Sequence, residues 1–241
     1  MSNSFITNKD KFLSDIINGI LPKTNAVDFL VGYFYYSGYK ELSEQLKDKR
    51  IRILIGLDIE IHITKHICEV ENFRQQLQSR GVLKEEYYAQ FIKAFNDTDF
   101  LDTEEKIGQF KMFYSKILDG SLEIRKTLEP CHSKMYLFAY SDIINEGGEN
   151  PGVLITGSSN LSYQGLKGRL ELNARFNDKI EYDEGKVIFE ELWKDAIVIA
   201  DKDNIDEWNN KVMKHIWFDT LYSPYLMFIR VLIEYFAIPS K

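Results

Sequence analysis

Long apolar runs separated by an amphipathic stretch dominate the first part of the chain. Residues 26–39 (AVDFLVGYFYYSGY) and residues 51–58 (IRILIGLD) are rich in β-branched and aromatic side chains. Such runs are typical of strands that are buried on both faces. Between them, residues 38–48 (GYKELSEQLKD) have the spacing of an amphipathic helix. This β-α-β order predicts a parallel pair of strands joined by a crossover helix.

The second half of the chain shows shorter apolar segments with strand character. Four further strands are predicted, at residues 121–128 (SLEIRKTL), 132–140 (HSKMYLFAY), 152–159 (GVLITGSS) and 169–176 (RLELNARF). The Gly/Asn/Pro-rich segment SDIINEGGENPG lies between the second and third of these and predicts a hairpin tip. Helices are expected at about 183–196, at 203–216 and after Pro224. We therefore expect an α/β fold with a mixed, mostly parallel β-sheet between helices.

The absence of internal repeats and low-complexity linkers favours a single domain over residues 1–241. Residues 60–118 are predicted to be mostly helical and contain two acidic stretches, so we expect a helical acidic insertion at about 82–118. A C-terminal helical segment at about 203–241 could lead into a further domain. Its apolar part is interrupted by Pro224, Arg230 and Glu234, which favours a packed helix over a membrane span.

Composition narrows the functional classes. Hydrophobic residues make up 44% and charged residues 28% of the chain, which is ordinary for a globular protein. The net charge of -7 means that any site for a polyanion must be a local basic patch. Cys68 and Cys131 lack the spacing of a disulfide framework, and the N-terminus lacks a signal-peptide core. We therefore expect free thiols and a cytoplasmic location.

An imidazole and an ammonium group lie close together in the predicted strand 132–140. Strand alternation places His132 and Lys134 on the same face. Burying either group costs free energy unless it meets a charge or a hydrogen-bond partner. The pattern therefore predicts that an anion binds on this face.

Groups that can hold oxygen atoms follow the next predicted strand. Gly157, Ser158 and Asn160 end that strand, and Glu171 lies eleven positions after Asn160. Glycine allows close approach of the backbone, while hydroxyl and amide groups donate hydrogen bonds. With Lys134 these residues would form a pocket for a tetrahedral oxyanion. His132 would act there as a nucleophile, and a carboxylate could orient its imidazole.

The order H-x-K, then G-S-x-N, then a glutamate resembles the signature of the phospholipase D-like superfamily, known as the HKD motif. The resemblance implies a phospholipase D-like fold and a metal-independent phosphodiesterase that cleaves DNA through a phosphohistidine, with no cofactor. The catalytic residues that it implies are His132, Lys134, Ser158, Asn160 and Glu171. The substrate-binding residues that we add are Gly157, Ser159 and Arg125.

The opening strands also resemble the first half of phospholipase D-like nuclease domains, so that the resemblance spans most of residues 25–180. Such domains occur as restriction-endonuclease cores and at the N-terminus of bacterial helicases, which makes a helicase a possible fused or associated partner. The aspartate that often follows the lysine by five residues is replaced by Ala139. The chain holds a single H-x-K, whereas the family usually builds one site from two motifs. We therefore expect a homodimer with the active site at its two-fold interface.

Alternative interpretations remain open at this point. The same pocket could grip a DNA phosphate without catalysis, as a binding module of a helicase; the missing aspartate and the acidic net charge favour this. A lipid phosphodiesterase is a third choice, since no amphipathic basic helix is evident. His62 and His66 have a spacing that can bind metal on a helix, but no third ligand is evident and no metal site is expected. We expect the Tyr and Phe clusters to belong to the core.

Overall fold

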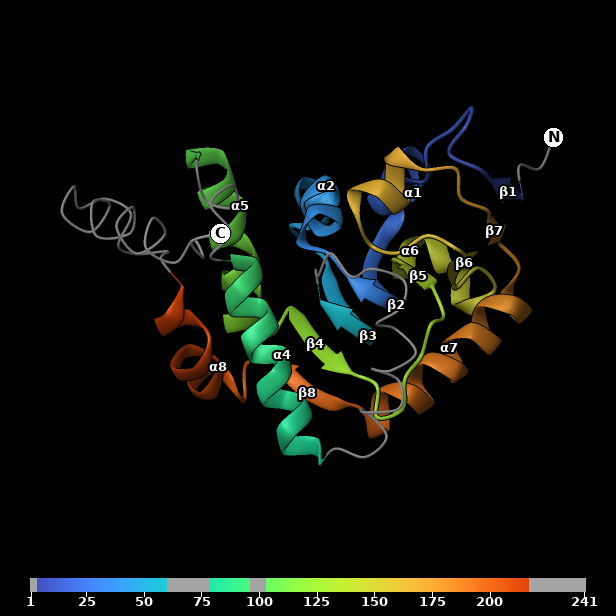
Figure 1. Ribbon diagram of the computed structural model, residues 1–241. Helices are drawn as coiled ribbons and strands as arrows, with labels where there is room; N and C mark the ends of the chain where they lie inside the picture. The colour runs from blue at the N-terminus through green and yellow to red at the C-terminus, as the bar shows by residue number, and fades with distance from the viewer. Residues whose placement is uncertain (1–3, 60–78, 96–102, 217–241) are drawn as a thin grey trace.

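The described strands form one mixed sheet in the order β1-β7-β6-β5-β2-β3-β4-β8. The computed structural model describes residues 4–59, 79–95 and 103–216. The strands are β1 (Phe5–Ile6), β2 (Thr24–Phe34), β3 (Arg50–Ile59), β4 (Leu122–Lys126), β5 (Met135–Tyr140), β6 (Gly152–Gly157), β7 (Asn173–Phe176) and β8 (Ile197–Ala200). The long strands β2 and β3 lie at its centre, with the shorter strands on either side (Figure 1).

Helices cover both faces of this sheet (Figure 1). The α-helices are α1 (Leu13–Ile20), α2 (Tyr36–Leu46), α4 (Arg80–Phe95), α5 (Glu104–Leu118), α6 (Asp142–Asn145), α7 (Lys179–Asp195) and α8 (Ile205–Lys211). The shorter helical turns are η1 (Leu21–Lys23), η2 (Glu146–Gly148), the π-helix η3 (Gln164–Gly168) and η4 (Met213–His215). Helix α7 packs on one face, and α1, α2, α4 and α5 pack on the other. No helix in the described ranges is long and apolar enough to cross a membrane.

The predicted α/β class and mixed sheet between helices are confirmed, but the expected parallel majority is wrong. Strands β2, β3 and β4 run parallel, with α2 as the crossover between β2 and β3. The other pairs among the described strands are antiparallel. A short connection between β5 and β6 forces an antiparallel pair. Burial on both faces, which the sequence indicates, does not determine strand direction.

Element boundaries differ from prediction where polar residues flank the strands. The segment predicted as strand 132–140 becomes regular only at Met135, and the last predicted strand begins at Asn173. The hairpin tip folds into α6 and η2. The predicted C-terminal helix after Pro224 lies outside the described residues, so the C-terminal segment and the division into domains stay predictions.

Alternate side chains of the central strands enter two apolar cores. Phe29, Val31, Tyr136 and Phe138 lie in the larger core with α1, α2, α4 and α5, while their neighbours face α7. Aromatic side chains of the helices join the larger core: Tyr36, Tyr39, Tyr87, Tyr88, Phe91, Phe95, Phe110 and Phe113. The core position predicted for the cluster at residues 86–91 is confirmed, whereas Tyr33 and Tyr35 of the cluster at residues 33–36 are only partly buried. Helices α4 and α5 of the predicted acidic insertion are therefore packed into the main core.

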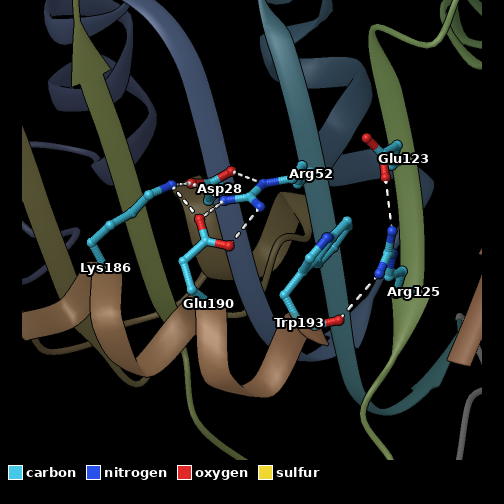
Figure 2. Close-up of polar contacts among 7 residues, drawn as sticks. All are labelled: Asp28, Arg52, Glu123, Arg125, Lys186, Glu190 and Trp193. Carbon is cyan, nitrogen blue, oxygen red and sulfur yellow. Dashed lines mark hydrogen bonds and ion pairs between the residues drawn. The ribbon is translucent and has the colours of Figure 1, made fainter. Parts of the chain in front are cut away.

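A partly buried network of charges joins α7 to the centre of the sheet (Figure 2): Asp28 and Arg52 are buried, whereas the Glu190 side chain is 46% exposed. On β3, Arg52 donates from Nε to Asp28 Oδ1 (2.6 Å) on β2 and from Nη2 to Glu190 Oε1 (2.6 Å) on α7. Lys186 bridges both carboxylates, at 2.5 Å from Asp28 and 3.0 Å from Glu190. Hydrogen bonds from Arg52 lower the pKa of Glu190 to about 2. Every charge in this network has a partner of opposite sign, which offsets the cost of burying it.

Candidate active site

Four chain segments meet at one edge of the sheet. His132 and Lys134 lie in the extended segment that enters β5, and Gly157–Asn160 leave β6. Because β5 and β6 are antiparallel, the start of one strand and the end of the other lie at the same edge. The segment before β7, which carries Glu171, and the end of β2 reach that edge as well.

Gly32 on β2 marks the point where three of the predicted residues converge. A Cβ atom built on Gly32 would lie 3.1 Å from His132 Cδ2. It would lie 3.4 Å from both Lys134 Nζ and Asn160 Oδ1. The absence of a side chain at Gly32 therefore lets an imidazole, an ammonium group and an amide share one small volume.

The His132 imidazole is exposed and has a defined neighbour on β2. Its ring packs edge-on against Tyr33, with ring centroids 6.1 Å apart and an interplanar angle of 80°. Partial burial lowers the pKa of His132, and the charge of Lys134 lowers it further. Both effects favour the neutral imidazole, which is the form that carries a free lone pair.

Lys134 is a buried cation, and no carboxylate of the described residues forms an ion pair with its ammonium group. Its side chain is 4% exposed, and Nζ donates to the backbone oxygen of His132 at 2.6 Å. Burial lowers the pKa of Lys134 to about 8, and the charges of Glu171 and Cys131 offset this only in part. The ammonium group is therefore protonated at neutral pH at a cost in free energy, which a bound anion would reduce.

Asn160 is oriented by the backbone of β2. Its Oδ1 accepts a hydrogen bond from Tyr33 N at 3.0 Å, which leaves the Nδ2 group as a donor for a ligand. The loop is fixed there because Leu161 bridges Phe34 and its carbonyl accepts from Tyr35 N at 3.1 Å. The amide is thus held in place before any ligand binds.

Ser158 and Glu171 contact each other directly. The Ser158 hydroxyl donates to Glu171 Oε2 and accepts from Leu172 N at 3.0 Å. Within the described ranges, no hydrogen bond joins Glu171 to His132, and Glu171 acts on Lys134 through its charge. A role for Glu171 in orienting the imidazole stays a prediction, as does direct contact of Ser158 with a ligand.

The three predicted substrate-binding residues are placed differently from one another. Gly157 lies beside the site, where a Cβ would come within 2.2 Å of Leu172 O, so the close approach of β6 and β7 requires glycine. Ser159 is fully buried and is held by the Asn173 side chain. Arg125 on β4 lies away from the cluster: Figure 2 shows it beside α7, where it donates to Trp193 O (3.2 Å) and Glu123 (3.3 Å).

Residues near the N-terminus hold the loop that carries Asn160 and Glu171, and no sequence pattern predicts this contact. Asn8, with a φ of 57°, donates from Nδ2 to Gly165 O (2.8 Å) and to Arg169 O (3.1 Å). The carbonyl of Thr7 accepts from Glu171 N at 3.3 Å. The role of Gly32 could have been predicted from the sequence, because a glycine inside a buried strand often marks a close approach of another chain segment.

Metal ligands do not gather in the part of the chain that the structure describes. There, no group of three or more His, Cys, Asp or Glu side chains is arranged to hold a metal ion. His62 and His66 lie outside the described residues, and His215 lies in η4.

Comparisons with known proteins identify relatives of this architecture. The family model described as "Cardiolipin synthase, PLD-like domain" matches residues 47–193, more than half of the 241 residues. No curated protein matches the chain. The chain is similar to Nuc, a phospholipase D family member from Salmonella typhimurium, with 10% identity and a TM-score of 0.40 over 76% of this chain and 88% of that one. NucT from Helicobacter pylori gives 10% identity and a TM-score of 0.42 over 81% and 97%.

The depressed pKa of Lys134 predicts an unusual effect on stability. Folding lowers the pKa from 10.5 to about 8, so the protonated lysine destabilises the native state below pH 8. This penalty disappears as the pH rises from 8 to 10.5. Lys134→Met should therefore melt at a higher temperature than the wild type at pH 7, and the difference should shrink toward pH 10.

Thermal melts of both proteins from pH 7 to 10 measure this difference. Lys194→Met, at an exposed position of α7, serves as the matched control and should leave the melting temperature unchanged. A Lys134→Met protein that melts below the wild type by the same amount at every pH would show that the lysine stabilises the fold.

Proposed function

Since this chain belongs to the phospholipase D-like superfamily, we propose that it is a phosphodiesterase that hydrolyses DNA through a phosphohistidine at His132. The observation that carries the proposal is the convergence of His132, Lys134 and Asn160 around Gly32. A nucleophile beside a cation and an amide donor is the arrangement that phosphoryl transfer needs. Because Lys134 supplies the positive charge and His132 the nucleophile, the reaction requires no metal ion.

In the first step, a ring nitrogen of His132 attacks phosphorus. A nitrogen–phosphorus bond forms, the bond from phosphorus to the leaving oxygen breaks, and a general acid gives that oxygen a proton. The lowered pKa of His132 favours the neutral, nucleophilic imidazole at neutral pH. Lys134, which is protonated below about pH 8, and the Asn160 amide would stabilise the charge on the phosphate oxygens.

In the second step, water attacks phosphorus, the bond to nitrogen breaks, and His132 is regenerated. The group that protonated the leaving oxygen now accepts the proton of the water. The chain has one H-x-K, so we assign this group to His132 of a second copy across a two-fold axis. The active form would then be a homodimer with one site at its interface.

A second candidate function is a phosphate-binding module without catalysis. One observation favours it: Ala139 on β5 lies opposite Ala26 and Gly152, so none of these three positions supplies the carboxylate that the family motif often has. The sequence resemblance to the N-terminal domains of bacterial helicases supports, for either function, a role beside a helicase or in a restriction system.

Plasmid nicking in the presence of EDTA tests the proposed activity. Wild-type protein should nick DNA in EDTA, and His132→Ala should abolish nicking because it removes the nucleophile. Lys134→Ala should reduce turnover by about 100-fold, comparable to the loss of one oxyanion donor. His215→Ala, at an exposed histidine of η4, is the matched control and should nick normally. Binding without nicking would favour the phosphate-binding module, and nicking that EDTA abolishes and Mg²⁺ restores would contradict the mechanism.

Subunit mixing tests the shared site. When wild type is equilibrated with an excess of His132→Ala, most wild-type chains enter heterodimers whose shared site lacks one imidazole. The activity per wild-type chain should therefore fall several-fold, whereas mixing with His215→Ala should leave it unchanged. A protein that sediments as a monomer at assay concentrations and still cleaves DNA would disprove the dimeric site.

A further inference from the structure

A pocket adjoins the candidate active site and shares two residues with it. It encloses about 350 Å³. The residues that line it are Tyr35, Ser37, Asn160, Ser162, Tyr163, Gln164, Gly165, Arg169 and Glu171. Because Asn160 and Glu171 belong to both, a ligand held at His132 and Lys134 would have its next chemical group at the mouth of this pocket.

The walls of the pocket combine aromatic rings with hydrogen-bonding groups. Tyr35 and Tyr163 supply aromatic surface, and Gln164 and two serine hydroxyls supply donors and acceptors. Tyr163 is 47% exposed. Arg169 is also exposed, and no ion pair joins it to a carboxylate within the described ranges. An acyl chain would leave these polar groups unpaired, whereas a heterocyclic base and a sugar would satisfy them.

An aromatic row connects the catalytic imidazole to the pocket wall. The Tyr33 ring lies 6.1 Å from the His132 ring, and the Tyr35 ring lies 6.4 Å from the Tyr33 ring. Tyr33 therefore contacts both the proposed nucleophile and Tyr35, a residue that lines the pocket. This spacing suits a unit that is covalently attached to the reacting phosphate.

We propose that this pocket binds the base and sugar of the nucleotide next to the scissile phosphate, with Tyr163 as a stacking surface. The inference rests on the proposed function and adds the identity of the bound group. The volume is at the lower end of that of small-molecule sites, which suits one nucleotide unit. Stacking on an aromatic side chain is open to every base, so the pocket provides affinity without sequence specificity.

The proposal has a consequence for the state of the DNA. A base can enter the pocket only when it leaves its stack, which costs free energy in a duplex and little in a single strand. The pocket thus selects single-stranded DNA, or a locally unpaired nucleotide in a duplex.

Binding to a protein without the nucleophile tests the pocket independently of catalysis. In the His132→Ala background, affinity is measured for an oligothymidine of about 12 nucleotides, roughly the length of one binding site. The comparison strand is abasic and has the same length and charge. Oligothymidine should bind roughly tenfold more tightly, because only it offers bases to the pocket. Adding Tyr163→Ala should bring the ratio of the two affinities close to one, by weakening oligothymidine binding and leaving abasic binding unchanged. Tyr163→Phe, which keeps the aromatic ring, should preserve the ratio.

If the His132→Ala protein does not fold, a kinetic comparison tests the pocket instead. In the otherwise wild-type protein, Tyr163→Ala should raise KM for oligothymidine several-fold, and should change KM for the abasic strand of equal length far less, because that strand has no base to stack on Tyr163. Equal affinity for the two strands, no binding of either, or a ratio that Tyr163→Ala does not alter would overturn the pocket assignment. If the wild type cleaves no diester while the ratio collapses as expected, the proposed function fails and the pocket assignment stands.

Discussion

The close approach of three chain segments at Gly32 is the constraint on which the candidate site depends. His132 precedes β5 and Asn160 follows β6, and they meet because β2 presents no side chain between them. An added Cβ at this position would lie 3.1 Å from His132 Cδ2, so the imidazole would have to shift, and atoms beyond Cβ would compete with the three side chains for the same space. The antiparallel pairing of β5 with both β2 and β6 brings these segments to the same edge. A local feature of one strand therefore sets the geometry of the whole site.

Two buried cations in this protein illustrate the difference between structural and functional charge. Arg52 is 6% exposed and is paired with Asp28 and Glu190; although burial alone would lower the pKa of Arg52, these partners raise it. Lys134 is 4% exposed and has a carbonyl oxygen as its close partner, so its pKa is lowered. The Arg52 network is complete without a ligand. Among the residues that the structure describes, none places a carboxylate in ion-pair contact with Lys134, and a phosphate is the kind of anion that would supply such a contact.

The sequence allowed prediction of those parts of the fold and site that depend on local pattern. The central strands β2 and β3, the crossover helix α2 and the aromatic core follow from apolar runs and helical spacing. The spacing of His132 and Lys134 and the cluster around Asn160 also pointed to one site, and these three side chains do lie together. Their catalytic roles stay predictions.

What the sequence could not provide depends on contacts between distant segments. The antiparallel majority of the sheet follows from connections whose direction a buried apolar run does not encode. The placement of Arg125 beside Trp193 and the burial of Ser159 depend on packing against α7 and Asn173. Asn8 contacts residues more than 150 positions away, and no pattern within its own segment signals that.

His132 is proposed to form a covalent bond to phosphorus, and this bond can be trapped chemically. Wild-type protein is mixed with a DNA oligonucleotide under single-turnover conditions, quenched in alkaline denaturant to preserve a phosphoramidate, digested with protease and analysed by mass spectrometry. We expect a transient nucleotide adduct on the peptide that contains His132, which forms and decays at the rate of cleavage. Cleavage that proceeds at the same rate with no adduct on His132, or with an adduct on another residue, would disprove a phosphohistidine at this position.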